Sequence, residues 1–478
     1  MKNCIYILIG WLLLTLNANA TTVDTLAIGD FGKVNIYLPE NISNAEVVIL
    51  VSGNDGWNKE MVDIAKVIKD QGALVVGVNL KHYLKMQSTY GAKCIYLAGN
   101  FESLSMGIQK RYKFKQYHRP ILVGYSTGAS FVYAVLAQAP SETFGGAITF
   151  GFNPEITTKN AFCEGNDLKS HPIKKGGKYY LEPCTQLKDP FIVLEGMIGQ
   201  SQKNIDLKKY VESVVLGELV LLPNIETDFS VTQNWLPQFV SAYNKVIKES
   251  VAIEKHSTEK ELPHGASFAP YSSDMPLSIM SSTAKEKLPL VFFISGDGGW
   301  KTFEHEICKN LSENGAPSIG LDALKYFWNE KQPKQVAEDI STAITHYMKQ
   351  WDRNSFILVG YSFGASVVPF IANNFTPALK DNIKGIFCFS PDKTGDFEIH
   401  IADMLSFDRI EKYDVLNELK LISALKPVCI FGSKEDADLQ KLFLDKGFKV
   451  ENLPGEHHFN NDYNAIAEII LKDFTTKK

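Results

Sequence analysis

Ser362 lies in the motif that gives this chain its clearest chemical signal. Residues 360–366 read GYSFGAS after an apolar run at 356–359, which is the pattern of a strand, a tight glycine-flanked turn and a helix. Such a turn exposes the serine hydroxyl, and glycine lets the neighbouring backbone come close. The motif predicts a nucleophilic serine, but it also occurs by chance, so other groups must support it.

A serine hydroxyl is a weak nucleophile until a base removes its proton, and an acid must orient that base. After the apolar run at 428–431, the segment 432–438 (GSKEDAD) offers the acid: Asp436 is the first choice and Glu435 the close competitor. Residues 453–459 (LPGEHHF) offer the base: His458 is the first choice and His457 the alternative. The chain order of serine, acid and histidine is that of α/β-hydrolases.

The negative oxygen that forms during attack on an ester needs two backbone N–H donors. Phe363, directly after the serine, supplies one of these amides. The second is expected from the glycine-rich loop at 295–300 (SGDGGW), with Asp297 as the donor. No spacing of cysteine and histidine suggests a zinc site, so the sequence predicts neither a metal nor another cofactor.

The serine motif occurs a second time, at 124–130 (GYSTGAS), where it carries Ser126. Residues 47–57 (VVILVSGNDGW) match 290–300 (LVFFISGDGGW), and 77–83 match 320–326 with one gap, so the chain contains a duplication. The first copy has no carboxylate at the required place in 194–200, and no histidine occurs between His171 and His256. Ser126 is therefore expected to be inert, and the first copy to serve in binding, assembly or shielding.

Short apolar runs alternate with helical patterns in the second half of the chain. Strands are predicted at 290–294, 317–321, 355–359, 384–389, 427–431 and 448–452, and helices at 333–350, 364–374 and 460–473. This alternation predicts an α/β protein of two tandem duplicated α/β-hydrolase-like domains, each a mostly parallel sheet flanked by helices. The domains are expected at 22–250 (degenerate) and 287–478 (catalytic), with a linker at 251–286. The short segment after Ser362 leaves little room for a lid, so an open site is expected.

The first twenty residues have the features of a secretory signal peptide. Lys2 is followed by an apolar run at 5–16, and small residues at 18 and 20 form a cleavage site, so we expect export to the periplasm. Outside the cytoplasm Cys163 and Cys184, which flank a polar insertion, could form a disulfide. The formal net charge is −5 and no basic stripe is present, so nucleic acid is not expected as a partner.

Four segments of the second half resemble the bacterial VirJ/AcvB virulence protein family: 292–300, 320–328 (GLDALKYFW), the serine motif and the LPGxHHF ending. The duplicated first half is similar to the longer AcvB-type members. The resemblance implies a periplasmic serine hydrolase of the α/β-hydrolase fold that cleaves aminoacylated phosphatidylglycerol, notably the lysyl form, and that is associated with virulence and type IV secretion. By position, it assigns Ser362 as nucleophile, His458 as base and Asp436 as orienting acid.

The implied substrate is the head-group ester of a phospholipid at the membrane surface, and its ammonium groups would favour acidic residues near the pocket. Asp322 and Asp392, at predicted strand ends, are the candidates for this role. Two other hypotheses stay open. One is a general carboxylesterase or lipase, and the other is a non-catalytic periplasmic scaffold that binds a protein partner through its N-terminal domain.

Overall fold

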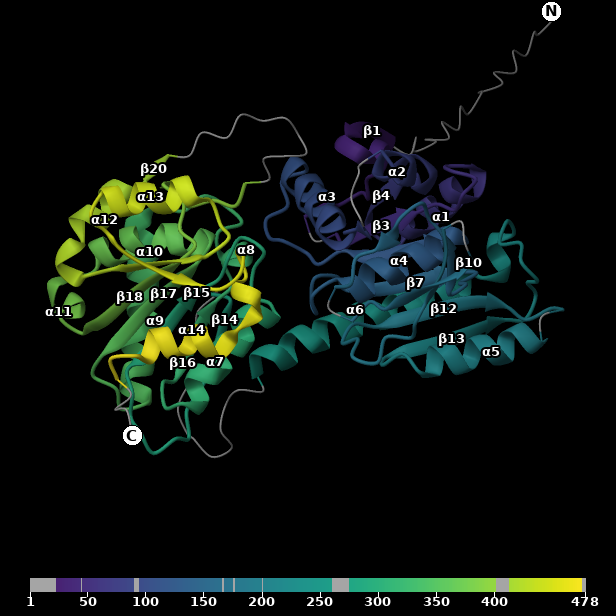
Figure 1. Cartoon of the computed structure of the whole chain (residues 1–478). Helices are drawn as coiled ribbons and strands as arrows, with labels where there is room; N and C mark the ends of the chain where they lie inside the picture. The colour runs from purple at the N-terminus through teal and green to yellow at the C-terminus, as the bar shows by residue number, and fades with distance from the viewer. Residues whose placement is uncertain are drawn as a thin grey trace, which may run out of the picture.

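The computed structural model describes residues 23–43, 45–89, 94–165, 167–174, 177–199, 201–259, 275–400 and 412–474. The chain forms a first half (described up to residue 259) and a second half (described from residue 275), each with a large sheet covered by helices (Figure 1). The predicted signal peptide, 1–20, lies outside the described residues. Within the part described, no helix is both long enough and apolar enough to cross a membrane.

The sheet of the first half has eight strands in the order β1-β2-β4-β3-β6-β7-β12-β13. It is parallel from β4 to β13, whereas β1 and β2 run antiparallel to their neighbours. Its strands are β1 (Val23–Ile28), β2 (Gly32–Tyr37), β3 (Val47–Val51), β4 (Leu74–Val78), β6 (Ile121–Tyr125), β7 (Gly146–Phe150), β12 (Phe191–Gly196) and β13 (Gly217–Leu222). The helices are α1 (Lys59–Asp70), α2 (Leu80–Gln87), α3 (Ala98–Arg111), α4 (Thr127–Gln138), α5 (Ser201–Glu212) and α6 (Leu236–Glu259). Short strands outside this sheet are β5 (Cys94–Ile95), β8 (Glu155–Thr157), β9 (Ala161–Phe162), β10 (Ser170–Lys174) and β11 (Lys178–Leu181).

The sheet of the second half has the strand order β14-β16-β15-β17-β18-β21-β22, and only β14 is antiparallel to its neighbour. Its strands are β14 (Leu277–Met280), β15 (Leu290–Ile294), β16 (Ser318–Leu321), β17 (Phe356–Tyr361), β18 (Ile383–Phe389), β21 (Val428–Gly432) and β22 (Lys449–Leu453). The helices are α7 (Thr302–Glu313), α8 (Ala323–Tyr326), α9 (Pro333–Gln350), α10 (Phe363–Asn374), α11 (Pro377–Lys380), α12 (Val415–Leu421), α13 (Ala437–Asp445) and α14 (Tyr463–Leu471). The short strands β19 (Thr394–Gly395) and β20 (Tyr413–Asp414) pair beside this sheet.

The duplication predicted from the sequence is confirmed by the topology. The order β2-β4-β3-β6-β7-β12-β13 is repeated strand for strand by β14-β16-β15-β17-β18-β21-β22, with β1 as an addition to the first half. Equivalent tryptophans also pack alike, Trp57 over Gly77 and Trp300 over Gly320. Both ends of the expected linker, 251–286, contain regular structure, because α6 continues to Glu259 and β14 starts at Leu277. Residues 260–274 lie outside the described residues.

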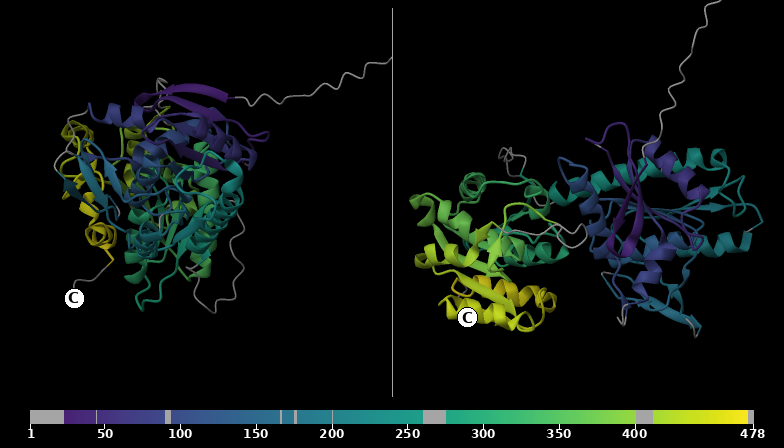
Figure 2. Two further views of the ribbon diagram at one scale, coloured as in Figure 1. Left: turned by 90° about the vertical axis from the view of Figure 1, so that its right-hand side faces the viewer. Right: turned by 90° about the horizontal axis from the view of Figure 1, so that it is seen from above.

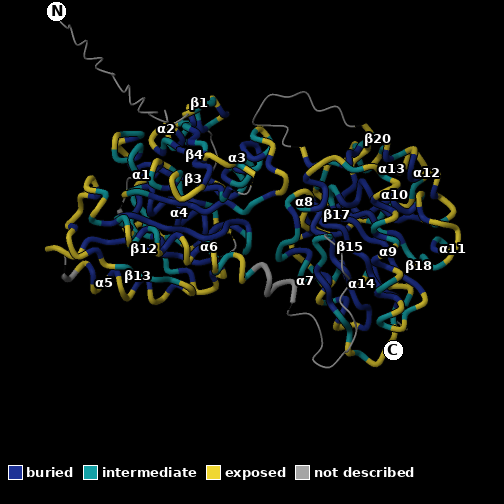
Figure 3. Tube along the Cα trace, turned by 180° about the vertical axis from the view of Figure 1, so that it is seen from behind, coloured by how far each residue is buried: buried dark blue, intermediate teal, exposed yellow. Residues whose placement is uncertain are grey.

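The central strands of both sheets, such as β3 and β15, are buried on their two faces, as parallel strands with helices on each side must be. Alternate residues of β15 belong to opposite apolar clusters, with Phe292 on one face and Phe293 on the other. The same alternation in β3 places Ile49 and Leu50 on opposite faces of the first sheet. Figure 3 shows these strands as the buried centre of each half. This packing holds the strand ends, where the loops carry the functional side chains, in fixed positions.

The two halves lie side by side (Figure 2), and side chains of one half contact the other. Trp328, which is 1% exposed, donates a hydrogen bond from its indole N–H to the Phe114 carbonyl at 2.8 Å. Tyr117 of the first half packs in the apolar core of the second, and Lys110 pairs with Glu398 at 2.9 Å. The halves are therefore docked through specific contacts as well as joined by the chain.

The expected disulfide between Cys163 and Cys184 is wrong. Cys163 is bonded to Cys94, because the parallel pairing of β5 with β9 brings these two cysteines to a Cα–Cα distance of 4.8 Å. Cys184 is a buried thiol whose sulfur lies 2.7 Å from Asp167 Oδ2. The thiols of Cys388 and Cys429 are free and buried.

Candidate active site

Ser362 lies in a strained turn between β17 and α10. Its backbone has φ 54° and ψ −113°, a conformation that is costly for a residue with a side chain. The flanking glycines are required, since a Cβ at Gly360 would collide with the Gly364 carbonyl, and one at Gly364 with the Ile294 carbonyl. The Ser362 N–H donates to the Phe389 carbonyl at 2.8 Å, which ties the turn to β18. This is the geometry of a nucleophile elbow.

The structure pairs His457 with Glu435. His457 Nδ1 lies 2.6 Å from Glu435 Oε1, and Glu435 Oε2 accepts hydrogen bonds from Ser390 Oγ at 2.9 Å and from the Gly432 N–H at 2.5 Å. Burial raises the pKa of a carboxyl group, but these three hydrogen bonds outweigh it and hold the pKa of Glu435 below its ordinary value. Glu435 is therefore an ionised acid that orients a histidine ring.

The pair that the sequence favoured, Asp436 and His458, is not formed. Asp436 is the N-cap of α13, and its carboxylate accepts hydrogen bonds from the backbone N–H of Asp438 at 2.9 Å and of Leu439 at 3.3 Å. The His458 ring packs against Phe303, with 5.4 Å between ring centroids, and burial lowers its pKa. The pair that does form lies one residue earlier at each position and consists of the two alternatives, Glu435 and His457.

The loop expected to hold the oxyanion lies against the serine. A Cβ placed on Gly296 would be 3.5 Å from the Ser362 Cβ, so Gly296 and the following Asp297 border the nucleophile. Phe363 is the first residue of α10, where backbone N–H groups have no partner within the helix. The amides of Asp297 and Phe363 remain the predicted oxyanion donors.

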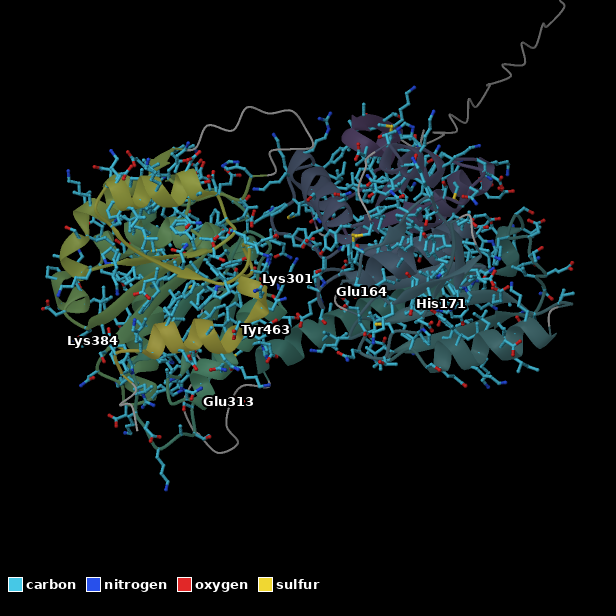
Figure 4. The ribbon with its side chains drawn as sticks, in the orientation of Figure 1. Glu164, His171, Lys301, Glu313, Lys384 and Tyr463 are labelled. Carbon is cyan, nitrogen blue, oxygen red and sulfur yellow. A yellow bond between two sulfur atoms is a disulfide. The ribbon has the colours of Figure 1, made fainter. Side chains whose placement is uncertain are left out.

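Ser362 and both histidines line one cavity of about 630 Å³. Its second-half wall also includes Asp297, Lys301 and Glu304. The opposite wall comes from the first half, with Tyr96, Ala98, Gly99, Glu102, Gln138, Pro140 and Gly165. Figure 4 shows Lys301 and Tyr463, which both line the cavity, on the side of the second half that faces Glu164 of the first. An open site was expected from the sequence, but residues of the first half line one side of the cavity that contains Ser362.

The acidic residues of this cavity differ from those proposed on the resemblance. Asp322 and Asp392 are not among the residues that line it; Asp322 caps α8 by accepting from the Lys325 N–H at 3.1 Å. Three other carboxylates, of Glu102, Asp297 and Glu304, line the cavity instead. Glu102 could not be predicted from the sequence because it comes from the other half of the chain, and Glu304 because it has the pattern of an ordinary helix residue.

Glu304 gives the cavity a group that titrates near neutral pH. Burial raises its pKa to about 7, against the hydrogen bonds that it accepts, including one from the Lys301 N–H at 3.1 Å. The folded protein then keeps a proton that the unfolded chain has lost above the usual carboxyl pKa, so this group destabilises the fold as pH rises towards 7.

We therefore expect the thermal unfolding midpoint of Glu304→Gln to exceed that of wild type by more at about pH 8 than at about pH 5. The gain between the two pH values should correspond to about 1–3 kcal/mol in the free energy of unfolding. Glu306→Gln, on the more exposed face of α7, is the matched control. Thermal unfolding followed by circular dichroism at both pH values measures the effect. Equal shifts for the two variants at both pH values would show that Glu304 does not titrate in this range.

The elbow of the first half keeps its backbone but lacks the partners. Ser126 has φ 53° and ψ −120°, close to the values at Ser362. It lines a cavity of about 290 Å³ with Glu195 and Lys203, which pair with each other at 2.9 Å, and no histidine is among the described residues that line it. Among the described residues of the whole chain, no cluster of His, Cys, Asp and Glu could hold a metal ion.

The family profile described as "Bacterial virulence protein (VirJ)" matches residues 45–145 and 289–478, together more than half of the chain. No curated protein sequence matches. Solved structures with similar folds include Est1E from Butyrivibrio proteoclasticus, with 16% identity and a TM-score of 0.32 over 42% of this chain and 93% of that one. A lipase-esterase related protein from Clostridium acetobutylicum matches with 15% identity and a TM-score of 0.32, over 42% of this chain and 99% of that one.

Proposed function

The chain belongs to the bacterial virulence protein VirJ family, and from this premise we propose that it is a periplasmic serine hydrolase that cleaves the aminoacyl ester of aminoacylated phosphatidylglycerol, in particular the lysyl form. The observation that carries the proposal is the cavity in which Ser362 lies with His457, whose ring is oriented by Glu435. Two further observations support it: three carboxylates line the cavity, and Cys94 and Cys163 form a disulfide.

In the proposed reaction His457 takes the proton of Ser362 as the hydroxyl oxygen attacks the carbonyl carbon of the aminoacyl ester. The carbonyl oxygen becomes negative and is held by the amides of Asp297 and Phe363, while Glu435 stabilises the protonated imidazole. The bond to the glycerol oxygen then breaks, His457 gives its proton to that oxygen, and phosphatidylglycerol leaves. Water, activated by the same histidine, releases the amino acid from the serine.

The cavity supports a substrate with a positive charge. Glu102 and Asp297 contribute carboxylates, and Glu304 contributes a third that is partly ionised at neutral pH, whereas Lys301 is the one lysine among the described lining residues. An aminoacyl group carries an α-ammonium, and a lysyl group carries a second ammonium. The ester of such a lipid lies in its head group, so the enzyme could reach the bond without entering the hydrocarbon layer.

The periplasmic location is supported by the signal-like residues 1–20 and by the disulfide between Cys94 and Cys163. Disulfides persist in oxidising compartments and are rare in the cytoplasm. The head groups of the outer leaflet of an inner membrane face the same compartment, so the proposed enzyme and substrate would meet there.

The test is the release of lysine from vesicles that contain lysyl-phosphatidylglycerol, measured beside the same vesicles with unmodified phosphatidylglycerol. We expect wild-type protein to release lysine and phosphatidylglycerol in equal amounts, and Ser362→Ala to release neither. p-Nitrophenyl acetate serves as the general ester. Hydrolysis of that ester without release of lysine would favour a general carboxylesterase, whereas no hydrolysis of either would favour a scaffold.

A further inference from the structure

The first half contributes a wall of the active site from two neighbouring segments. Tyr96, Ala98, Gly99 and Glu102 belong to the start of α3 and the residues before it, and Gly165 follows β9. The disulfide between Cys94 and Cys163 joins these two segments, a short distance along the chain from the lining residues Tyr96 and Gly165. The wall is thus a fixed part of the site, although every catalytic group proposed above belongs to the other half.

Glu102 connects this wall to the catalytic half. Its Oε1 lies 2.7 Å from Lys301 Nζ, and the two side chains are only 13% and 17% exposed. Lys301 directly follows the glycine-rich loop of the predicted oxyanion donor, and its own N–H bonds to Glu304. The carboxylate of Glu102, which comes from the first half, is therefore held through Lys301 next to the loop of the predicted oxyanion donor, in the cavity that Ser362 also lines.

We propose that Glu102 is a specificity-determining residue, whose carboxylate binds the ammonium of the acyl group while it stays paired with the Lys301 ammonium. The inference rests on the proposed function in that it places the acyl group of the ester in this cavity. A carboxylate has two oxygens and about four lone-pair sites, so it can accept from two ammonium groups at once. Charge-assisted hydrogen bonds of this kind are about twice as strong as neutral ones, and more so when they are shielded from water.

The first test compares two esters with the same leaving group and acyl chain length, lysine p-nitrophenyl ester and p-nitrophenyl hexanoate. We expect Glu102→Gln to lower kcat/KM for the lysine ester about tenfold or more, and to change that for the hexanoate less than about twofold. The matched control is Glu398→Gln, which also breaks an ion pair between the halves, at Lys110, but does not line the cavity. Equal changes for both esters, or the same change in both variants, would overturn the proposal.

A binding measurement separates failure of this inference from failure of the proposed function. In the Ser362→Ala background, isothermal titration with lysinamide reports affinity without chemistry. We expect Glu102→Gln to weaken lysinamide binding about tenfold and Glu398→Gln to leave it unchanged within about twofold. If wild type hydrolyses neither ester, the proposed function fails, yet this titration still decides the role of Glu102. Lysinamide binding that is equal in all variants, or absent from all of them, would reject that role.

Discussion

Ser362→Ala is expected to lower kcat for p-nitrophenyl acetate by at least about 10³-fold, because loss of a serine nucleophile removes the covalent route entirely. Ser126→Ala is the matched control, since it removes the same hydroxyl from the same strained turn in the other half. It is expected to leave kcat unchanged within about twofold, because no histidine reaches Ser126 among the described residues around it.

Labelling with a fluorophosphonate probe measures the same difference without a chosen substrate. Wild type and Ser126→Ala should be labelled on Ser362, and Ser362→Ala should not be labelled. Labelling that persists in Ser362→Ala and disappears in Ser126→Ala would place the chemistry in the first half. Circular dichroism of each variant shows whether it is folded when it is tested.

Glu435→Gln is expected to lower kcat by about 10²–10⁴-fold, because a neutral amide can neither stabilise the protonated imidazole nor fix the ring in the required tautomer. Asp436→Asn is the matched control at the next position. Asparagine is also a good N-cap, so α13 should keep its cap and kcat should change less than about twofold.

Steady-state kinetics with p-nitrophenyl acetate decide between the two acids, and the same comparison applies to the histidines. His457→Ala should lose activity as fully as Ser362→Ala, whereas His458→Ala should lose less, because its ring packs on Phe303 while the Glu435 carboxylate pairs with His457. A large loss in Asp436→Asn with a small one in Glu435→Gln would restore the acid first chosen from the sequence.

The features that depend on local pattern could be predicted from the sequence. The helix at 333–350 is observed as α9 with the same bounds, and the six strands predicted in the second half are observed within a residue or two of their expected bounds, whereas β14, β19 and β20 were not predicted. Strand and helix periodicity and the glycines around Ser362 carry this information directly. The duplication followed from matching segments, and the repeated strand order confirms it.

The choice within each adjacent pair could not be made from the sequence. Glu435 and Asp436 are both acidic and lie in one turn, and only the start of α13 decides that Asp436 serves as the cap while Glu435 turns towards His457. The disulfide partner of Cys163 depended on the pairing of β5 with β9, two strands of only two residues each. The wall that includes Glu102 depended on how the halves dock, which no local pattern encodes.

The two elbows have nearly the same backbone angles, although histidines line the cavity of Ser362 and, among the described residues, none lines that of Ser126. A turn of this kind holds strain of about 1–3 kcal/mol, and among the described residues of the first half no histidine lines the cavity of its serine. Its persistence follows from the tight approach of α4 to β3, where a Cβ at Gly128 would collide with the Val51 carbonyl. The backbone of this turn therefore marks a nucleophile elbow by its shape in both halves, whereas histidines beside the serine are found, among the described residues, in the second half alone.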